Sequence, residues 1–232
     1  MKIHLSFVLI LILLCGCKNN NDNYEILIKC NDCNNLNISL WQLVDTTLYP
    51  IGLTKIEHNK AIFKGDVVHP TLMFIYTQDC SDYFPIFVEN SEIDIEFNYL
   101  RPSKSVVRGS QSHKIFNDFL QSYSAYEDKS MAIEKMIKNA KDNFDTLMVL
   151  SLENDKNKLE IEKTEFQKQY IKNNVTSSVS AYILSNNLMY NISLDDLQYM
   201  LNLFPKEFEN NIYIKNAQNY LNYLKNNAKY ES

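Results

Sequence analysis

The feature that most constrains the fold is a change in hydrophobic period near Gly109. Before it, apolar and polar residues alternate, most clearly in residues 36–40 and 93–97, which predicts strands with one buried face. After it, apolar residues recur every three or four positions, which predicts amphipathic helices. We therefore expect an α+β protein: a mainly antiparallel β sandwich or half-open barrel, followed by an α-helical region.

The expected strands are short and closely spaced. Residues 71–76 and 83–88 are apolar on both sides and read as central strands. Between two other strands, residues 57–60 predict a tight hairpin in which Asn59 adopts a positive φ. Short connections of this kind favour antiparallel neighbours.

Several amphipathic segments make up the expected helical region. One apolar stripe covers residues 133–148, and a polar run at residues 154–157 predicts a break before the stripe resumes. Residues 177–190 predict a further apolar helix. Ser193 predicts the N-cap of the next helix, which ends before Pro205.

The amino terminus predicts export and lipid attachment. A basic Lys2 precedes an apolar run over residues 5–14, which has the length of a signal-peptide core and is too short to span a bilayer. The run ends in Leu14-Cys15-Gly16-Cys17, which resembles the lipobox of bacterial lipoproteins. We therefore expect residues 1–16 to be a signal peptide and Cys17 to be the lipidated first residue of the mature chain.

This anchor defines the expected organisation and location. Residues 17–23 form a short lipidated tether, residues 24–109 the β domain and residues 110–232 the helical domain. Several acyl chains on one residue anchor a protein stably. We expect a lipoprotein of the cell envelope at the outer membrane, and the sequence leaves open whether it faces the periplasm or the cell surface.

Composition excludes several classes of function. The formal net charge is −5 and no basic stripe is evident, so we expect no nucleic-acid partner. The chain has only 4 glycines, too few and too dispersed for a phosphate-binding loop. Its histidines lack metal-ligand spacing, and we expect neither a metal nor a cofactor. No nucleophile, base and orienting group form a recognisable set, so we expect no catalytic residues and favour a non-enzymatic role.

The cysteines offer one candidate site. Cys30 and Cys33 form a CxxC motif, which permits a thiol-disulfide redox pair, a turn disulfide or two ordinary thiols. The motif lies between two strands and not at a helix amino terminus, and Asp32 would disfavour a thiolate. These features favour a structural role. Cys80 could pair with either cysteine.

Three further groups of residues each allow a structural and a functional interpretation. Trp41 lies opposite the buried face of its strand, so it marks either a docking surface or a contact with the helical half. Glu92, Asp94 and Glu96 form an outward acidic row, which is typical of a solvated strand and also compatible with a cation. Asp195 and Asp196 are explained by helix capping.

The order of these motifs resembles the DUF4369 module found in lipoproteins of Bacteroidetes-type bacteria. The resemblance covers residues 24–110 and extends through the helical segment. The matching pieces are Leu40-Trp41, residues 60–65 (KAIFKG), residues 87–90 (FVEN), residues 106–110 (VVRGS) and residues 166–184.

In many relatives this arrangement precedes a thioredoxin-like, AhpC/TSA-type redoxin domain. The resemblance therefore implies the accessory region without that domain, and no catalytic residue of the family can be placed in this sequence. Our leading hypothesis is a lipid-anchored binding or accessory module with an envelope protein or small ligand as its partner. The alternative is a thiol-disulfide redox protein, or an accessory subunit of a thioredoxin-like protein.

Overall fold

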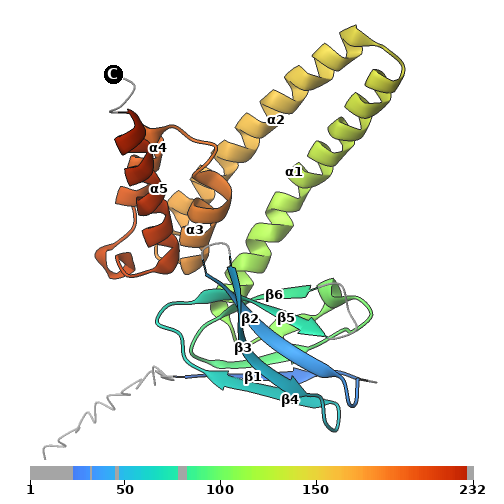
Figure 1. Ribbon diagram of the computed structural model, residues 1–232, viewed down its shortest axis with the longest axis vertical. Coiled ribbons are helices and arrows are strands. Elements are labelled where there is room, and N and C mark those ends of the chain that lie inside the picture. The colour runs from blue at the N-terminus through green and yellow to red at the C-terminus, as the bar shows by residue number, and fades with distance from the viewer. Residues whose placement is uncertain (1–22, 32, 45–46, 78–82, 229–232) are drawn as a thin grey trace, which may run out of the picture.

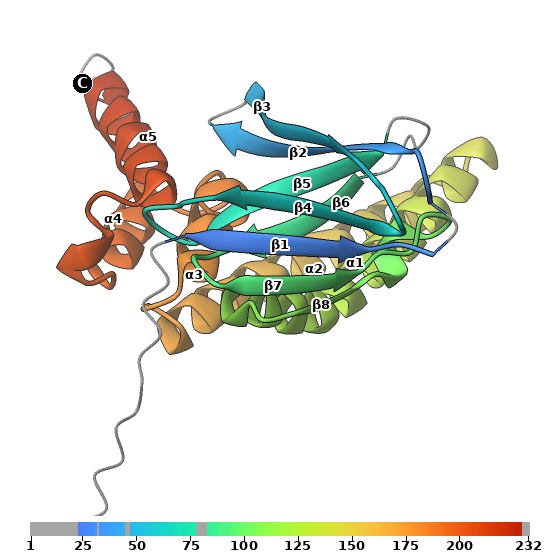
Figure 2. The ribbon, with the colours of Figure 1, turned by 90° about the horizontal axis from the view of Figure 1, so that it is seen from below.

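The β half is built from two four-stranded sheets (Figures 1 and 2). The computed structural model describes residues 23–31, 33–44, 47–77 and 83–228, and all counts below refer to these. Sheet I contains, in spatial order, β4 (Lys60–Gly65), β1 (Tyr24–Lys29), β7 (Glu92–Glu96) and β8 (Val106–Arg108). Sheet II contains β3 (Thr47–Lys55), β2 (Asn37–Val44), β5 (Thr71–Thr77) and β6 (Tyr83–Val88).

The two sheets share one apolar core. The inward side chains of both sheets are at most 1% exposed at Ile26, Ile28, Ile38, Leu40, Ile75, Ile86, Ile93 and Ile95. The alternation in residues 36–40 and 93–97 therefore predicted the buried face correctly. β1 and β7 run parallel, with Ile26 beside Ile93, and the other strand pairs are antiparallel. The expected α+β architecture with a mainly antiparallel two-sheet half is confirmed.

The turn between β3 and β4 has the predicted conformation. His58 and Asn59 have φ values of 50° and 62°, and Glu57 bridges to Lys60. The predicted hairpin is wrong, because β3 pairs with β2 in sheet II and β4 pairs with β1 in sheet I. The turn instead connects the two sheets and closes one side of the sandwich.

β6 is an edge strand, which corrects the prediction that residues 83–88 form a central strand. Its apolar residues alternate between two environments, because helices cover the second face of the strand at Phe87, whereas Tyr83 on the same face is exposed. Its backbone edge is also protected: Pro85 has no N–H, and the carbonyl of Phe87 accepts a hydrogen bond from Ser110 Oγ at 2.9 Å. Apolar residues on both faces of a strand therefore indicate that other elements cover those faces, and they do not show that the strand lies in the centre of its sheet.

The helical half begins with a long antiparallel hairpin, which we call the arm (Figure 1). It is formed by α1 (Gln111–Asp142) and α2 (Thr146–Asn173). The remaining elements are η1 (Pro102–Lys104), which precedes the arm, and α3 (Ser178–Ile183), the π-helical η2 (Leu184–Leu188), α4 (Leu194–Asn202), η3 (Lys206–Phe208) and α5 (Ile212–Ala228). The last elements pack against the base of the arm (Figure 1).

The break between the two arm helices lies at residues 143–145, not at residues 154–157. Phe144 has a φ of 57° and Asp145 caps α2 by accepting the N–H of Met148. The polar run at 154–157 stays helical, and Lys156 within it pairs with Glu134 across the arm at 2.7 Å. The predicted stripe over residues 133–148 was therefore wrong at its end, where Phe144 is 92% exposed.

Sheet II joins the two halves through one end of its outer face. Leu72 and Phe87 belong to the core of the helical region, where Phe87 contacts the rings of Phe116 and Tyr182. Tyr213 Oη accepts the backbone N–H of Leu72 at 2.8 Å. These contacts leave the other end of the same face uncovered by the helical core.

Candidate functional site

The uncovered end of sheet II carries four aromatic side chains, which we call the aromatic strip: Trp41, Phe74, Tyr76 and Tyr83. Directly paired residues share a face of a sheet, and the register pairs Trp41 with Phe74 and Tyr76 with Tyr83. The rings form a connected chain. Centroid distances are 6.2 Å for Trp41–Tyr76, 5.7 Å for Tyr76–Tyr83 and 5.2 Å for Phe74–Tyr83.

The strip is partly exposed and flanked by an exposed apolar side chain. Tyr83 is 52% exposed, and Leu53, on the neighbouring part of β3, is 74% exposed. Trp41 and Tyr76 are half-buried. Of the four strip residues, Phe74 alone also packs against the helical core. The strip therefore begins at the covered end of the face and extends into solvent.

Polar atoms give the strip amphipathic character. Trp41 Nε1 donates to Ser39 Oγ at 2.8 Å, so the indole is fixed in place. Partial burial, followed by the nearby phenol of Tyr83, raises the pKa of Tyr76. Tyr76 therefore stays protonated, and its hydroxyl group can both donate and accept hydrogen bonds. Aromatic side chains with fixed orientation and a polar tip are typical of protein-binding surfaces.

Trp41 lies on the face that packs against the helices further along the sheet. The sequence left open a docking surface or a contact with the helical half. The ring contact of Trp41 is with Tyr76, and within the described residues Trp41 is absent from the helical core and its partly buried neighbours.

Cys30 and Cys33 are joined by a disulfide, with their Cα atoms 5.6 Å apart. The bond connects the end of β1 to the turn before β2, and both residues are 1% exposed within the core of the sandwich. Thiol-disulfide exchange requires an attacking thiolate to reach a sulfur. This geometry therefore fits a structural crosslink better than an exchange site. Cys80 and Cys17 lie outside the described residues.

The acidic row of β7 forms part of a ladder of ion pairs on the outer face of sheet I. Lys29 pairs with Asp94, and Arg108 pairs with Glu96 at 2.6 Å. Hydrogen bonding to Glu96 raises the pKa of Arg108. Cross-strand cations therefore neutralise most of the row, as expected for a solvated strand. No group of three or more metal-binding side chains occurs in the described part of the chain.

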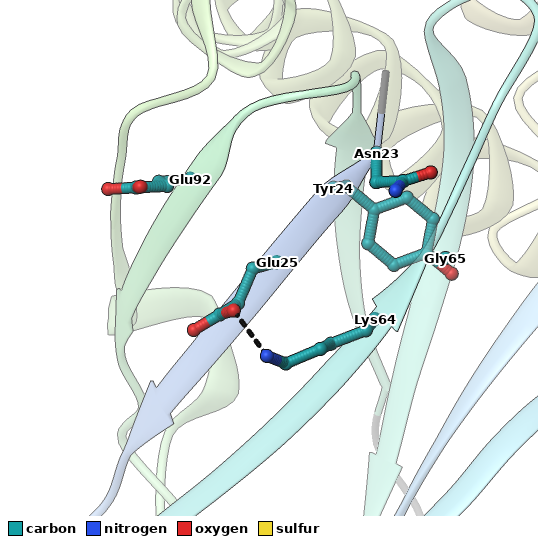
Figure 3. A pocket seen from close by; sticks show the side chains of 6 residues that line it. All are labelled: Asn23, Tyr24, Glu25, Lys64, Gly65 and Glu92. Atoms are coloured by element: carbon teal, nitrogen blue, oxygen red, sulfur yellow. Dashed lines mark ion pairs between the residues drawn. The ribbon is translucent and has the colours of Figure 1, made fainter. Parts of the chain in front are cut away.

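A shallow hollow of about 470 Å³ lies at the start of β1 (Figure 3). Tyr24 lies over Gly65, and Glu25 forms an ion pair with Lys64 at 2.7 Å. Glu92, on the neighbouring strand, extends away from this pair (Figure 3). The charges are paired with each other and do not converge on the hollow. The arrangement therefore offers no geometry for catalysis.

Ser193 is the N-cap of α4, as the sequence predicted, and Asp196 lies in the first turn of this helix. The backbone N–H of Asp196 donates to Ser193 Oγ at 3.1 Å, and its carboxylate pairs with Lys168 at 3.0 Å. The hydrogen bond from Lys168 lowers the pKa of Asp196. Asp195 and Asp196 both lie in the first turn of α4, where carboxylates interact favourably with the helix dipole.

Residues 21–116 match the family model described as Domain of unknown function (DUF4369). No curated protein matches the chain. The DUF4369 match contains all eight described strands and continues to Phe116 in α1. The family domain therefore includes the first turns of the arm, which protect the edge of β6. Both ends of the aromatic strip also lie within it.

Sequence reasoning identified Trp41 within the DUF4369 domain but missed Tyr76 and Tyr83. The signal was present in β5, where Phe74 and Tyr76 alternate with the buried Met73 and Ile75. An apolar residue on both faces indicated complete burial, whereas only part of the second face is covered.

No described helix is long and apolar enough to span a membrane.

Proposed function

We propose that this protein is a lipoprotein of the cell envelope and that its DUF4369 domain binds a partner protein through the aromatic strip. Acyl chains on Cys17 hold it at the outer membrane. The anchor is supported by the Leu14-Cys15-Gly16-Cys17 motif after an apolar run of signal-peptide length. A tether of residues 17–23 spans at most about 25 Å, which keeps the start of β1 close to the lipid surface.

The main support for a binding role is that the helical region covers only one end of the outer face of sheet II. Helices bury Leu72 and Phe87 at one end of the outer face, whereas Trp41, Tyr76 and Tyr83 stay accessible at the other. Leu53 extends this accessible apolar area across the sheet. Contiguous exposed aromatic and aliphatic side chains mark interaction surfaces more often than scattered single residues do.

Strand addition is not the expected mode of binding. Pro50 interrupts the donors of the edge strand β3, and α1 occupies the edge of β6 through Ser110. We therefore propose that the partner lies across the face of the sheet and contacts the side chains of the strip.

A catalytic role finds less support. Burial lowers the pKa of His113 to about 4. Its Nδ1 accepts the N–H of Phe87 at the junction of the two halves, so this nitrogen is occupied within the fold. Binding accounts for the arrangement better than general acid-base chemistry.

The disulfide favours one version of the alternative function. A thioredoxin-like partner could be recruited by the DUF4369 domain without any exchange at Cys30 and Cys33, because both sulfurs are buried. In this version the protein is an accessory subunit, and the redox chemistry belongs to the partner.

Site-specific photo-crosslinking in cells tests the proposal. p-Benzoylphenylalanine replaces Tyr83 in the full-length chain, and products are identified by mass spectrometry. Ile62 is the matched control, because it is 46% exposed on the outer face of sheet I. We expect a discrete product at position 83 that is absent at position 62. Equal products at both positions, or none, would contradict a role of the strip.

The anchor is tested separately with Cys17→Ser. We expect the variant to lose metabolic labelling by a palmitate analogue and to leave the membrane fraction. Retained labelling would refute the assignment of Cys17. A thioredoxin-fold protein in the product at position 83 would support the accessory role, and Cys30→Ala/Cys33→Ala should then leave its recovery unchanged.

A further inference from the structure

The outer half of the arm is a two-helix hairpin without a third layer. It projects away from the sandwich and from α3–α5 (Figure 1). Its own buried core contains only Ile137, Ala140 and Leu152, with Ile133 and Val149 packed beside them. Isolated helices derive most of their stability from packing an apolar face, so two helices with so small a core are incomplete.

One face of the arm has two adjoining apolar hollows. The first, of about 260 Å³, includes Met136, Ala140, Met148 and Leu152. The second, of about 380 Å³, includes Ala132, Ile133, Met136 and Leu159. Met136 belongs to both and is 46% exposed. The two hollows therefore form one continuous apolar face between α1 and α2.

Four charged side chains border the second hollow: Lys129, Asp155, Lys158 and Glu162. Asp155 and Lys158 pair with each other at 3.5 Å. Lys163 pairs with Glu127 at 3.0 Å and Lys156 with Glu134 at 2.7 Å, which fixes how the two helices align. In that alignment Lys129 of α1 and Glu162 of α2 lie at the same height, on opposite sides of the second hollow. Neither forms an ion pair within the described residues.

We propose that the arm pairs with the arm of a second copy of this chain. The two apolar faces pack around a twofold axis parallel to the arms, which gives a four-helix bundle. This axis places α1 of one copy against α2 of the other, so that all neighbouring helices are antiparallel, as in up-down-up-down bundles. Lys129 of each copy then meets Glu162 of the other at the same height, so both contacts are attractive.

The size of the face determines how strong this pairing is. From Lys129 to Asn143 the helix rises about 21 Å, and two helices are about 20 Å wide, so the flat face measures about 400 Å². A stable interface buries about 800 Å² on each partner. The arms therefore form a weak pair, which accumulates where copies are concentrated. The proposal goes beyond the binding role of the aromatic strip and does not depend on it.

The test uses the full-length chain in its membrane, with p-benzoylphenylalanine at position 136. We expect a covalent dimer of this chain. The control position is Leu150, which is 59% exposed on α2 but does not contribute to either hollow. Leu150 should give no dimer.

Charge reversal then separates contacts between copies from contacts within one copy. Lys129→Glu and Glu162→Lys should each reduce the dimer about fivefold, because two attractive contacts become repulsive. A mixture of the two variants, carrying different tags, should recover the cross-linked hetero-pair, since each contact between the two copies then joins a lysine to a glutamate again. Failure of the mixture to recover, reversals without effect, or products of position 136 with other proteins alone would overturn the proposal.

Discussion

The backbone N–H of Phe87 in β6 donates to Nδ1 of His113 in the first turns of α1, at 3.4 Å. The imidazole contacts the rings of Phe84 and Phe116. Burial in these surroundings lowers the pKa of His113 to about 4. The bond requires an unprotonated Nδ1, so the junction between sheet II and the arm depends on a neutral histidine.

This relationship predicts a specific dependence of stability on pH. Well above pH 6.5 His113 is neutral in both the folded and unfolded states, and its contribution is complete. Between pH 6.5 and about 4 only the unfolded state binds the proton, so stability falls as the pH falls. We expect the contribution of His113 to the free energy of unfolding to drop by about 2 kcal/mol between pH 7 and 4.5.

His113→Asn is the matched variant, because its side-chain oxygen can accept the N–H of Phe87 and does not titrate. Urea unfolding at both pH values measures the difference between the two proteins. An equal loss of stability in the wild type and the variant would contradict the role of His113.

Gly109 connects β8 to α1 and should not tolerate a side chain. Its φ is 88°, and an added Cβ would lie 1.9 Å from the carbonyl oxygen of Glu92. We expect Gly109→Ala to cost at least about 3 kcal/mol of stability, because backbone must move. Gly52→Ala is the control, since its Cβ would meet only the side chain of Phe63 at 3.0 Å. Thermal unfolding compares the two variants, and similar Tm losses would refute this account.

Tyr213 should contribute to stability through its hydroxyl group. Burial raises its pKa, and Oη accepts the N–H of Leu72 at 2.8 Å. Tyr213→Phe leaves this buried N–H without an acceptor, and we expect a loss of about 1 to 3 kcal/mol. Tyr223→Phe, on the same helix but 61% exposed, should change stability little. Denaturant unfolding tests both, and an unchanged Tyr213→Phe would show that Leu72 finds another acceptor.

Local sequence patterns predicted the type and extent of most strands and helices, but they did not predict which other elements would pack against each one. Alternation predicted the buried positions of β2 and β7. A strand with one solvent-exposed face has polar residues at every second position, and this pattern is visible in the sequence itself. β6 was assigned to the centre of a sheet because burial by a helix and burial by a neighbouring strand select the same residue types. That distinction depends on distant contacts such as Phe87 with Tyr182.

The arm and the aromatic strip also show that local patterns do not predict distant contacts. Phe144 and Leu147 continue a helical period, yet they are 92% and 82% exposed at the tip. The chain turns where Phe144 adopts a positive φ and Asp145 caps α2. Trp41 could be identified alone, whereas its neighbours Tyr76 and Tyr83 are brought to it by the register of three strands.

The disulfide between Cys30 and Cys33 should resist reduction while the protein is folded. Both residues are 1% exposed in the sandwich core, so a reducing thiol can reach the sulfurs only after local or global unfolding. We expect the rate of reduction by dithiothreitol, followed by alkylation and mass spectrometry, to rise sharply with urea. In native buffer it should stay far below the rate for the urea-unfolded chain.

The stability effect of this bond should be modest, because it closes a very short loop. The loss of chain entropy in the unfolded state corresponds to about 2 kcal/mol, so Cys30→Ala/Cys33→Ala should remain folded with a lower Tm. Rapid reduction of the folded wild type would contradict the buried geometry. It would also favour the redox function over the binding role, because an accessible disulfide at the end of β1 could then exchange with a partner thiol.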